Sequence, residues 1–255
     1  MKTALVTGSS RGIGRATAVA LAESGHAVVL TARGREDLAE AADAVAAAGG
    51  VARVERCDFG DEESIEGLFE RLDDDGVAID VLVNNVGVAR MADFEDVDDA
   101  EWNLNWSVNV MSAVRCGRRA IPGMAERGWG RVVNVSSSAG KRPSAKWPAY
   151  APTKAALQAL TIVWADAYGS AGVRVNAVCP GPVKTPMWTA EDGLWREVAD
   201  DRAEALERVG EKLPVSRMGR PDEVAAAIAF LCGDEASWVH GAILSVDGGN
   251  VGIVV

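Results

Sequence analysis

The stretch Thr7-Gly8-Ser9-Ser10-Arg11-Gly12-Ile13-Gly14 lies near the start of the chain, between a short apolar run at 3–7 and an alanine-rich stretch at 12–24. The first run is typical of a buried strand and the second of a helix. Glycines between them let the chain turn tightly and let its backbone approach a pyrophosphate, which the free N–H groups at the helix N-terminus then stabilise. The spacing is Gly-x3-Gly-x-Gly, unlike the general Gly-x-Gly-x2-Gly form. The prediction of a dinucleotide site therefore rests on the position of the glycine loop between a strand and a helix.

The same alternation of strand and helix patterns continues along the whole chain. It predicts an α/β fold, a Rossmann-type doubly wound sheet of seven parallel strands with helices on both faces. We expect strands at 3–7, 27–31, 51–57, 79–83, 131–136, 173–178 and 242–246. We expect helices at 12–24, 35–48, 62–74, 98–127, 149–168 and 221–232, the fourth with a break near Asn109 because it is too long for one ordinary helix.

Length limits the number of domains, and charge limits the classes of binding partner. The 255 residues suit one domain spanning 1–255. A formal net charge of −11 argues against nucleic acid or an anionic membrane as a partner. The four cysteines are far apart and the chain has only two histidines, so we expect no metal site and a reducing compartment, the cytoplasm. No apolar run approaches the ~20 residues that span a bilayer.

One segment, at about 186–220, breaks the alternation. It carries no strand pattern and is polar, acidic and partly helical. Ligands of doubly wound sheets bind beyond the carboxyl ends of the strands. An insert directly after the sixth strand is therefore expected to lie over the pocket as a lid or specificity loop. The alternative is a pair of surface or subunit-contact helices.

The end of the second strand predicts which nicotinamide cofactor binds. A carboxylate there would bind the ribose diol, whereas a basic residue accommodates a 2′-phosphate. The strand ends Leu30-Thr31-Ala32-Arg33, without a carboxylate. Arg33 and Arg11 together suit a phosphate, so NADP(H) is preferred. The alternative is that both are ordinary surface arginines.

The stretch Tyr150-Ala151-Pro152-Thr153-Lys154 places a phenol and an ammonium on one face of a helix, since residues four apart are stacked. Pro152 fits the first turn, which needs no N–H from it. A nearby cation favours the phenolate and is expected to lower the pKa of Tyr150, which makes this residue a candidate proton donor. A chance surface pair is the alternative. Three consecutive serines, at 136–138, end the preceding strand.

Together these motifs resemble those of the short-chain dehydrogenase/reductase family, and the resemblance covers nearly the whole chain. The residues that carry it are 7–14, Asn84-Asn85-Val86-Gly87, Asn109, Ser137, Tyr150 with Lys154, Pro180-Gly181-Pro182-Val183-Lys184-Thr185 and Val246-Asp247-Gly248-Gly249. Val86 stands where the family more often has alanine.

The resemblance implies four catalytic residues. Tyr150 would be the general acid in reduction, and Lys154 would hold the nicotinamide ribose. Ser137 would hydrogen-bond the substrate oxygen, although Ser136 and Ser138 stay open as alternatives. Asn109 would interrupt its helix and hold a water that relays protons to Lys154.

The resemblance also implies a set of cofactor contacts. Asp58 would contact the adenine, Asn85 and Gly87 would line the adenosine side, and Thr185 would bind the carboxamide. The complete implied set is Gly8, Ser10, Arg11, Gly12, Ile13, Gly14, Arg33, Asp58, Asn85, Gly87, Tyr150, Lys154, Pro180, Gly181, Val183 and Thr185.

The substrate is expected to be a hydrophobic ketone, because the pattern is similar to that of β-ketoacyl and aromatic polyketide ketoreductases. Trp147 and Trp188 are expected beside it, with Ser137 and Tyr150. If the substrate is bound to an acidic acyl carrier, a basic docking patch is needed, and Arg115, Arg118, Arg119, Arg127 and Arg131 are candidates.

Three alternatives stay open. The basic helix can instead pack in the interface of a homotetramer, or of a homodimer. The substrate can be a free secondary alcohol such as a sugar alcohol, steroid or terpenoid. A non-catalytic NADP(H)-sensing or scaffold protein on the same fold is the third, since fold alone does not establish activity.

Overall fold

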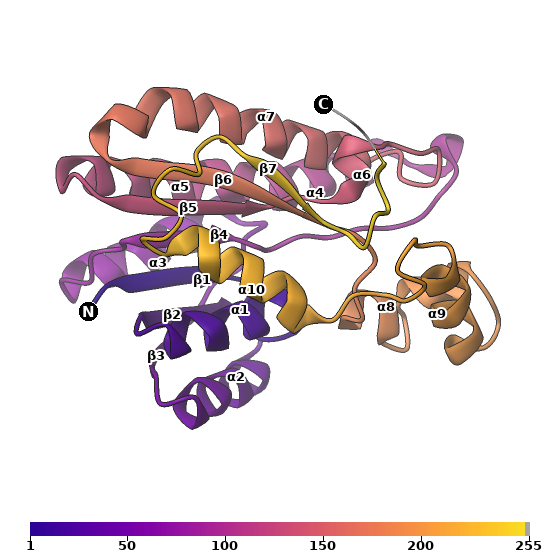
Figure 1. Cartoon of the computed structure of the whole chain (residues 1–255), viewed down its shortest axis with the longest axis horizontal. Coiled ribbons are helices and arrows are strands. Elements are labelled where there is room, and N and C mark those ends of the chain that lie inside the picture. The colour runs from indigo at the N-terminus through magenta and orange to yellow at the C-terminus, as the bar shows by residue number, and fades with distance from the viewer. Residues whose placement is uncertain (253–255) are drawn as a thin grey trace.

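The computed structural model describes residues 1–252, which contain one parallel sheet of seven strands with helices on both faces (Figure 1). The strand order is β3-β2-β1-β4-β5-β6-β7. The predicted fold class is confirmed, while residues 253–255 of the expected domain lie outside the described part. The strands are β1 Thr3–Thr7, β2 Ala27–Ala32, β3 Val51–Arg56, β4 Val81–Asn84, β5 Gly130–Val135, β6 Val173–Pro180 and β7 Ile243–Val246.

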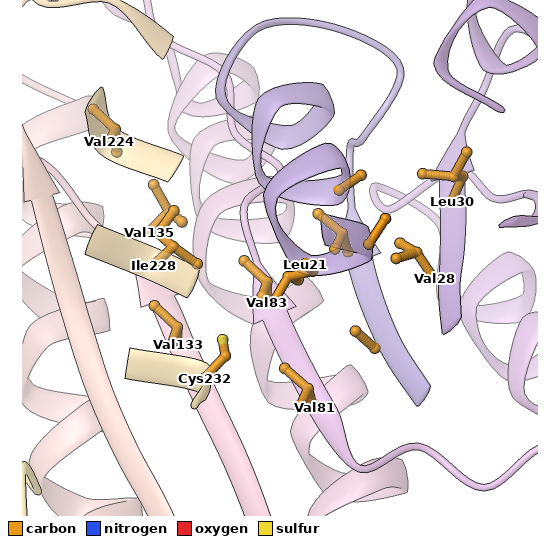
Figure 2. Packing of buried hydrophobic residues seen from close by; sticks show 14 of the residues in the cluster. Leu21, Val28, Leu30, Val81, Val83, Val133, Val135, Val224, Ile228 and Cys232 are labelled. Carbon is orange, nitrogen blue, oxygen red and sulfur yellow. The ribbon is translucent and has the colours of Figure 1, made fainter. Parts of the chain in front are cut away.

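The helices cover the sheet in two layers, each with its own apolar core. One layer is formed by α1 Gly12–Glu23, α2 Arg35–Ala47 and α10 Pro221–Cys232. Figure 2 shows Leu21 of α1 and Ile228 of α10 beside the valines of β4 and β5. The other layer is formed by α3 Glu62–Asp74, α5 Ser112–Glu126 and α7 Tyr150–Tyr168.

The helix predicted at 98–127 is continuous, so the expected break at Asn109 takes another form. The chain forms α4 Asp99–Trp106, then a π-helical segment Ser107–Met111, then α5. A π-helical segment adds a residue to one turn without ending the helix, and such segments occur frequently at functional sites. Asn109 lies in the middle of it, with only 1% of its surface exposed.

The insert after β6 is helical, with no strand. It contains α8 Pro186–Thr189, the 3-10 segment Leu194–Glu197 and α9 Arg202–Glu211. Figure 1 shows α8 and α9 projecting beyond one end of the sheet. The short elements elsewhere are the 3-10 segments Phe94–Asp96 and Gly169–Ala171 and the helix α6 Ser138–Lys141.

Two further features bear on the sequence predictions. All four cysteines are buried and free of disulfides. Among residues 1–252, no helix has the length and apolar character needed to cross a membrane, and no group of His, Cys, Asp or Glu side chains is arranged to hold a metal ion.

Candidate active site

The glycine loop lies where the strand order reverses, between β1 and β4, which is the point where doubly wound sheets bind ligands. Asn85 fixes the loop there, because its side-chain amide donates to the carbonyls of Thr7 and Gly8 at 2.9 and 3.0 Å. A Cβ atom on Gly14 would lie 2.2 Å from the Gly8 carbonyl oxygen. Gly14 is therefore required for the close packing of α1 on the strand.

The loop has the properties of a phosphate site. Gly8 and Gly12 have φ angles of +65° and +57°, which L side chains rarely adopt. The N-terminus of α1 has no capping side chain, since its N-cap is Arg11. Its first N–H groups therefore lack the usual side-chain partner and fit an anion.

Arg11 in this loop and Arg33 after β2 are both exposed, which fits the predicted phosphate contact and the alternative of ordinary surface arginines equally. Within the described residues, the guanidinium groups of Arg11 and Arg33 form no ion pair or hydrogen bond with the protein. Ser10 is buried, and the side chain of Ile13 packs against the core, so Ile13 can contact a cofactor only through its backbone. Asp58 is exposed, and its carboxylate accepts a hydrogen bond from the Gly60 N–H at 2.9 Å.

The loop after β6 reaches the glycine loop. A Cβ atom on Gly12 would lie 3.3 Å from the Cβ of Thr185. The side chain of Val183 is buried in the core, 4% exposed, so it too offers only its backbone. A Cβ atom on Gly181 would lie within 2.8 Å of the Asp247 carbonyl, and β6 ends at Pro180. Thr185 of this loop thus lies beside the glycine loop, whereas Gly181 lies against Asp247.

Tyr150 and Lys154 are brought together at the start of α7. The Lys154 ammonium lies 5.7 Å from the centre of the Tyr150 ring, and it donates to the Val135 carbonyl at 3.0 Å. Lys154 is 3% exposed. A Cβ atom on Gly87 would be 3.3 Å from the ammonium, so Gly87 leaves space in front of it. An ammonium has three N–H donors, and the Val135 carbonyl accepts from one of them.

The expected lowering of the Tyr150 pKa is wrong. Burial raises the pKa of Tyr150 to about 12, and a hydrogen bond with Ser137 acts in the opposite direction. Burial also lowers the pKa of Lys154 to about 8. The hydrogen bond of the ammonium goes to a main-chain carbonyl rather than to the phenol, so desolvation outweighs the attraction that sequence spacing suggested.

The three serines occupy different environments. Ser137 is partly exposed, interacts with Tyr150, and accepts a hydrogen bond from the Ala139 N–H at 3.1 Å as the N-cap of α6. Ser136 and Ser138 are buried. The structure therefore places Ser137, rather than its neighbours, beside Tyr150.

Asn109 is held from several sides. Its amide donates to the carbonyl of Val88 and the hydroxyl of Thr153, and its oxygen accepts from the Val88 N–H at 2.8 Å. A Cβ atom on Gly87 would lie 3.2 Å from that oxygen. Asn109 and Lys154 thus both border Gly87, but the side chain of Asn109 is occupied by protein partners.

The two tryptophans predicted near substrate lie in different surroundings. The ring of Trp147 packs at 5.4 Å from that of Tyr150. Trp188 lies in α8 of the insert, half-buried. Two cavities of about 390 and 260 Å³ lie along the segment 88–93 that follows Gly87, and Ser137, Trp147, Tyr150 and Trp188 line neither of them. Their lining residues are Val88, Ala89, Arg90, Ala100, Glu101, Leu104 and Asn105 for the first, and Arg90, Met91, Ala92, Asp93, Asp96, Lys146 and Glu197 for the second.

Sequence reasoning missed several residues that shape the site. Thr7 accepts hydrogen bonds from the main chain of Asn85 and Val86, and Gln158 contacts the serine loop. The position of Gln158, one turn after Lys154 on the same helix face, was a signal that could have revealed it.

The expected basic docking patch is not a free positive surface. Arg115 pairs with Glu62, Arg119 with Glu66 and Asp73, and Arg127 with Asp80. Arg131 is buried and pairs with Asp234. Only Arg118 of the five is exposed and unpaired within the described residues. Most of these partners are acidic residues of α3. They lie along the face of α5 that carries the arginines and neutralise the expected positive patch.

Comparisons with known proteins agree with this geometry. Residues 8–250 match the family described as enoyl-(acyl carrier protein) reductase. The chain is 40% identical to cis-4-hydroxycyclohexanecarboxylate dehydrogenase of Sinomonas cyclohexanicum, covering 99% of this chain and 97% of the relative. It is 37% identical to the 3-oxoacyl-(acyl-carrier-protein) reductase FabG of Vibrio harveyi, covering 97% and 96%.

A solved structure gives the same result. A variant of actinorhodin polyketide ketoreductase, in complex with NADPH, is 31% identical and superposes with a TM-score of 0.93 over 99% of this chain and 98% of the other. The family match spans most of the chain, and the catalytic motifs lie together at one edge of the sheet. The chain therefore belongs to the short-chain dehydrogenase/reductase family of oxidoreductases.

Proposed function

We propose that this protein is an NADP(H)-dependent ketoreductase that reduces a hydrophobic ketone to a secondary alcohol, with Tyr150 as the proton donor. The observation that carries the proposal is the grouping of Ser137, Tyr150 and Lys154 at the sheet edge that also carries the uncapped glycine loop. The site accommodates a nicotinamide cofactor, because the free N–H groups of α1 and the space at Gly87 lie along the same edge.

The protein residues handle the proton. When bound, the nicotinamide supplies or accepts the hydride. A pKa of about 12 keeps Tyr150 protonated at neutral pH, so its hydroxyl can donate to a ketone oxygen as negative charge develops there. Ser137 would orient the same oxygen. The Lys154 ammonium stabilises negative charge nearby and would bind the ribose.

NADP(H) is assigned to this chain for two reasons. Arg11 and Arg33 are exposed near the ends of β1 and β2, with no carboxylate partner among residues 1–252, and guanidinium groups suit a 2′-phosphate. The similar actinorhodin ketoreductase holds NADPH. Arg11, Arg33 and the implied contacts of Asp58, Asn85 and Thr185 are part of this proposal.

The substrate class is argued from the aromatic surroundings of Tyr150. Trp147 packs on its ring, which favours an apolar ketone over a polyol. The FabG relative and the polyketide ketoreductase fit a β-ketoacyl or polyketide substrate. The second candidate is a dehydrogenase of a free secondary alcohol, favoured by the 40% identity to the hydroxycyclohexanecarboxylate dehydrogenase. The pairing of the α5 arginines favours a free substrate over a carrier that docks on this helix.

Compartment and assembly remain predictions. Four buried free cysteines support the cytoplasm, where thiols stay reduced. Exposed apolar side chains on α4 and α7 support a homotetramer or homodimer: Leu104, Trp106, Ile162 and Val163.

The test follows NADPH and NADH absorbance with short β-ketoesters, carrier-mimic thioesters, decalones and cyclic hydroxy acids. We expect NADPH-dependent reduction of an apolar ketone. Arg11→Ala and Arg33→Ala should each raise KM for NADPH about tenfold or more, as expected for loss of a charged phosphate contact. Arg118→Ala, an exposed arginine of α5, is the matched control. An NADH preference would contradict the cofactor assignment, and absence of turnover with tight NADPH binding would favour a sensor.

A further inference from the structure

Helix α7 presents a third polar residue toward the catalytic centre. Tyr150, Lys154 and Gln158 are spaced by four residues and so share one face of the helix. The first two are assigned roles by the proposed function. Gln158 is half-buried one turn beyond Lys154, and its amide is directed into the serine loop that precedes α6.

The Gln158 amide nitrogen has three acceptors within reach. They are the Ser136 hydroxyl at 3.0 Å, the Ser137 main-chain carbonyl at 3.2 Å and the Cys179 sulfur at 3.4 Å. The amide has two hydrogens, so these contacts share them. Gln158 therefore joins the serine loop to α7 and lies against β6.

Gly140 makes room for this contact. A Cβ atom there would lie 2.5 Å from the Gln158 amide nitrogen and 2.8 Å from the main-chain carbon of Lys154. Any larger residue at position 140 would push the serine loop away from the helix. The serine loop thus approaches α7 closely because position 140 is a glycine and because the amide of Gln158 bonds the loop.

A second hydrogen bond completes the connection. The Ser136 hydroxyl donates to the Lys154 main-chain carbonyl at 2.8 Å. The loop is consequently held at two successive residues, on either side of the peptide that links Ser136 to Ser137. These contacts fix the main chain of Ser137, while its hydroxyl caps α6 and interacts with Tyr150.

We propose that Gln158 is a positioning residue, which holds the main chain of Ser137 so that the Ser137 hydroxyl meets Tyr150. The inference rests on the proposed function, because it gives Gln158 its effect through Ser137 and Tyr150. Gln158 need not touch the substrate. Its removal lets the serine loop shift, and displacements of about 1 Å at a catalytic group can cost ~10²-fold in rate.

The informative substitution is Gln158→Glu. The two side chains have nearly the same size, but a carboxylate has no hydrogen to donate to the Ser137 carbonyl. Gln158→Met removes the donor without adding charge, and it decides the question if the glutamate variant fails to fold. Asn250→Ala is the matched control. Asn250 is also an amide that bonds the serine loop, but it donates to the Ser138 hydroxyl at 2.9 Å.

Steady-state kinetics in both directions provide the first readout. We expect both Gln158 variants to lower kcat about 10-fold or more, with the NADPH dissociation constant and the KM for ketone unchanged within about twofold. Asn250→Ala should keep kcat within the same twofold range. A Gln158 variant with wild-type kcat would overturn the proposal.

The pH profile of alcohol oxidation provides the second readout, which a purely structural role would not move. Oxidation needs the phenolate, and the Ser137 hydrogen bond lowers the pKa of Tyr150. Displacing Ser137 should therefore move the rising limb of the profile to higher pH. The titratable groups near Tyr150 are Lys154 and Cys179, and Gln158→Glu adds a carboxylate beside Cys179, so the uncharged Gln158→Met carries this readout.

A third readout does not depend on turnover. The chain has two tyrosines, so the Cζ resonance of Tyr150 can be assigned by NMR with Tyr168→Phe. We expect this resonance to shift in Gln158→Glu and Gln158→Met but not in Asn250→Ala. A lower melting temperature with unchanged kcat, pH profile and resonance would assign Gln158 a merely structural role. A wild-type protein that reduces no ketone would instead contradict the proposed function, whatever the variants do.

Discussion

The catalytic centre and the insert both lie at the carboxyl edge of the sheet, yet they are built in opposite ways. Around Tyr150, the polar residues are buried and hydrogen-bonded within the protein: Asn109 is 1% exposed, Thr153 0% and Lys154 3%. The insert is polar and mostly exposed, with few buried apolar residues, among them Leu194 and Leu213. Segments with few buried contacts open at low free energy. From this comparison we expect reaction chemistry to reside in the buried centre and substrate choice in the exposed insert.

The largest expected effect is on the centre. Tyr150→Phe should lower kcat by about 10²–10⁴, because it removes the general acid, while NADPH binding stays intact. Single-turnover reduction and fluorescence titration of NADPH measure the two separately. Tyr168→Phe is the control, since it makes the same change at the other end of α7. Equal turnover of Tyr150→Phe and wild type would refute the assignment.

The second effect is on stability. The pKa of Lys154 is lowered to about 8 from an ordinary 10.5. Between these values the unfolded chain binds the proton and the folded chain does not, so this residue makes the unfolding free energy rise with pH. Relative to Lys154→Met, the wild type should gain up to about 3 kcal/mol between those two pH values. Denaturant titrations of both proteins across that range measure the difference, and a constant difference would contradict the expectation.

The third effect tests the insert. Trp188→Ala in α8 should raise KM for a bulky ketone about 3- to 10-fold and leave kcat within about twofold, the pattern of a residue that binds ground state and transition state alike. Trp238→Ala is the control, since Trp238 is 96% exposed in a loop before β7. A fall in kcat as large as that of Tyr150→Phe would contradict the expectation that the insert affects substrate binding and not the chemical step.

The smallest expected effect concerns aspartate N-caps, one on the helix that leads into the Asn109 segment and one on a helix of the insert. Asp98 accepts from the Glu101 N–H at the start of α4, and Asp201 accepts from the Glu204 N–H at the start of α9. Replacing either by alanine should cost about 1 kcal/mol. Because α4 continues into the Asn109 segment, only Asp98→Ala should also reduce kcat, whereas Asp201→Ala should increase hydrogen exchange of α9 alone. An equal fall in kcat in the two variants would show that the regions are coupled.

The sequence predicted the strands well, because local patterns decide them. Glycines that need positive φ, alternating apolar runs and residues four apart on a helix are all visible along the chain. The Thr3–Thr7 strand and the Glu62–Asp74 helix have the predicted bounds.

Features that depend on the tertiary environment, such as pKa values and long-range ion pairs, could not be predicted from the sequence. Spacing placed Lys154 near Tyr150 but could not show that burial would control both pKa values. The α5 arginines were read as free because their carboxylate partners lie on α3, about fifty residues away in the chain. The π-helical form of the Asn109 segment was likewise not predictable, because no local pattern distinguishes it from the expected break.

The two ends of the insert meet at one point of the fold, and its residues Pro214 and Val215 also pack against Gly249 and Gly248. Val183 and Gly219 form a parallel bridge, with the Gly219 N–H donating to the Pro182 carbonyl and the Lys184 N–H to the Gly219 carbonyl, each at 2.9 Å. The chain thus departs and returns through one pair of neighbouring peptides. Changing the length of such a closed segment costs little entropy. Residues 186–218 are therefore a natural cassette for exchange between homologous enzymes, with Ser137, Tyr150, Lys154 and Thr185 left unchanged.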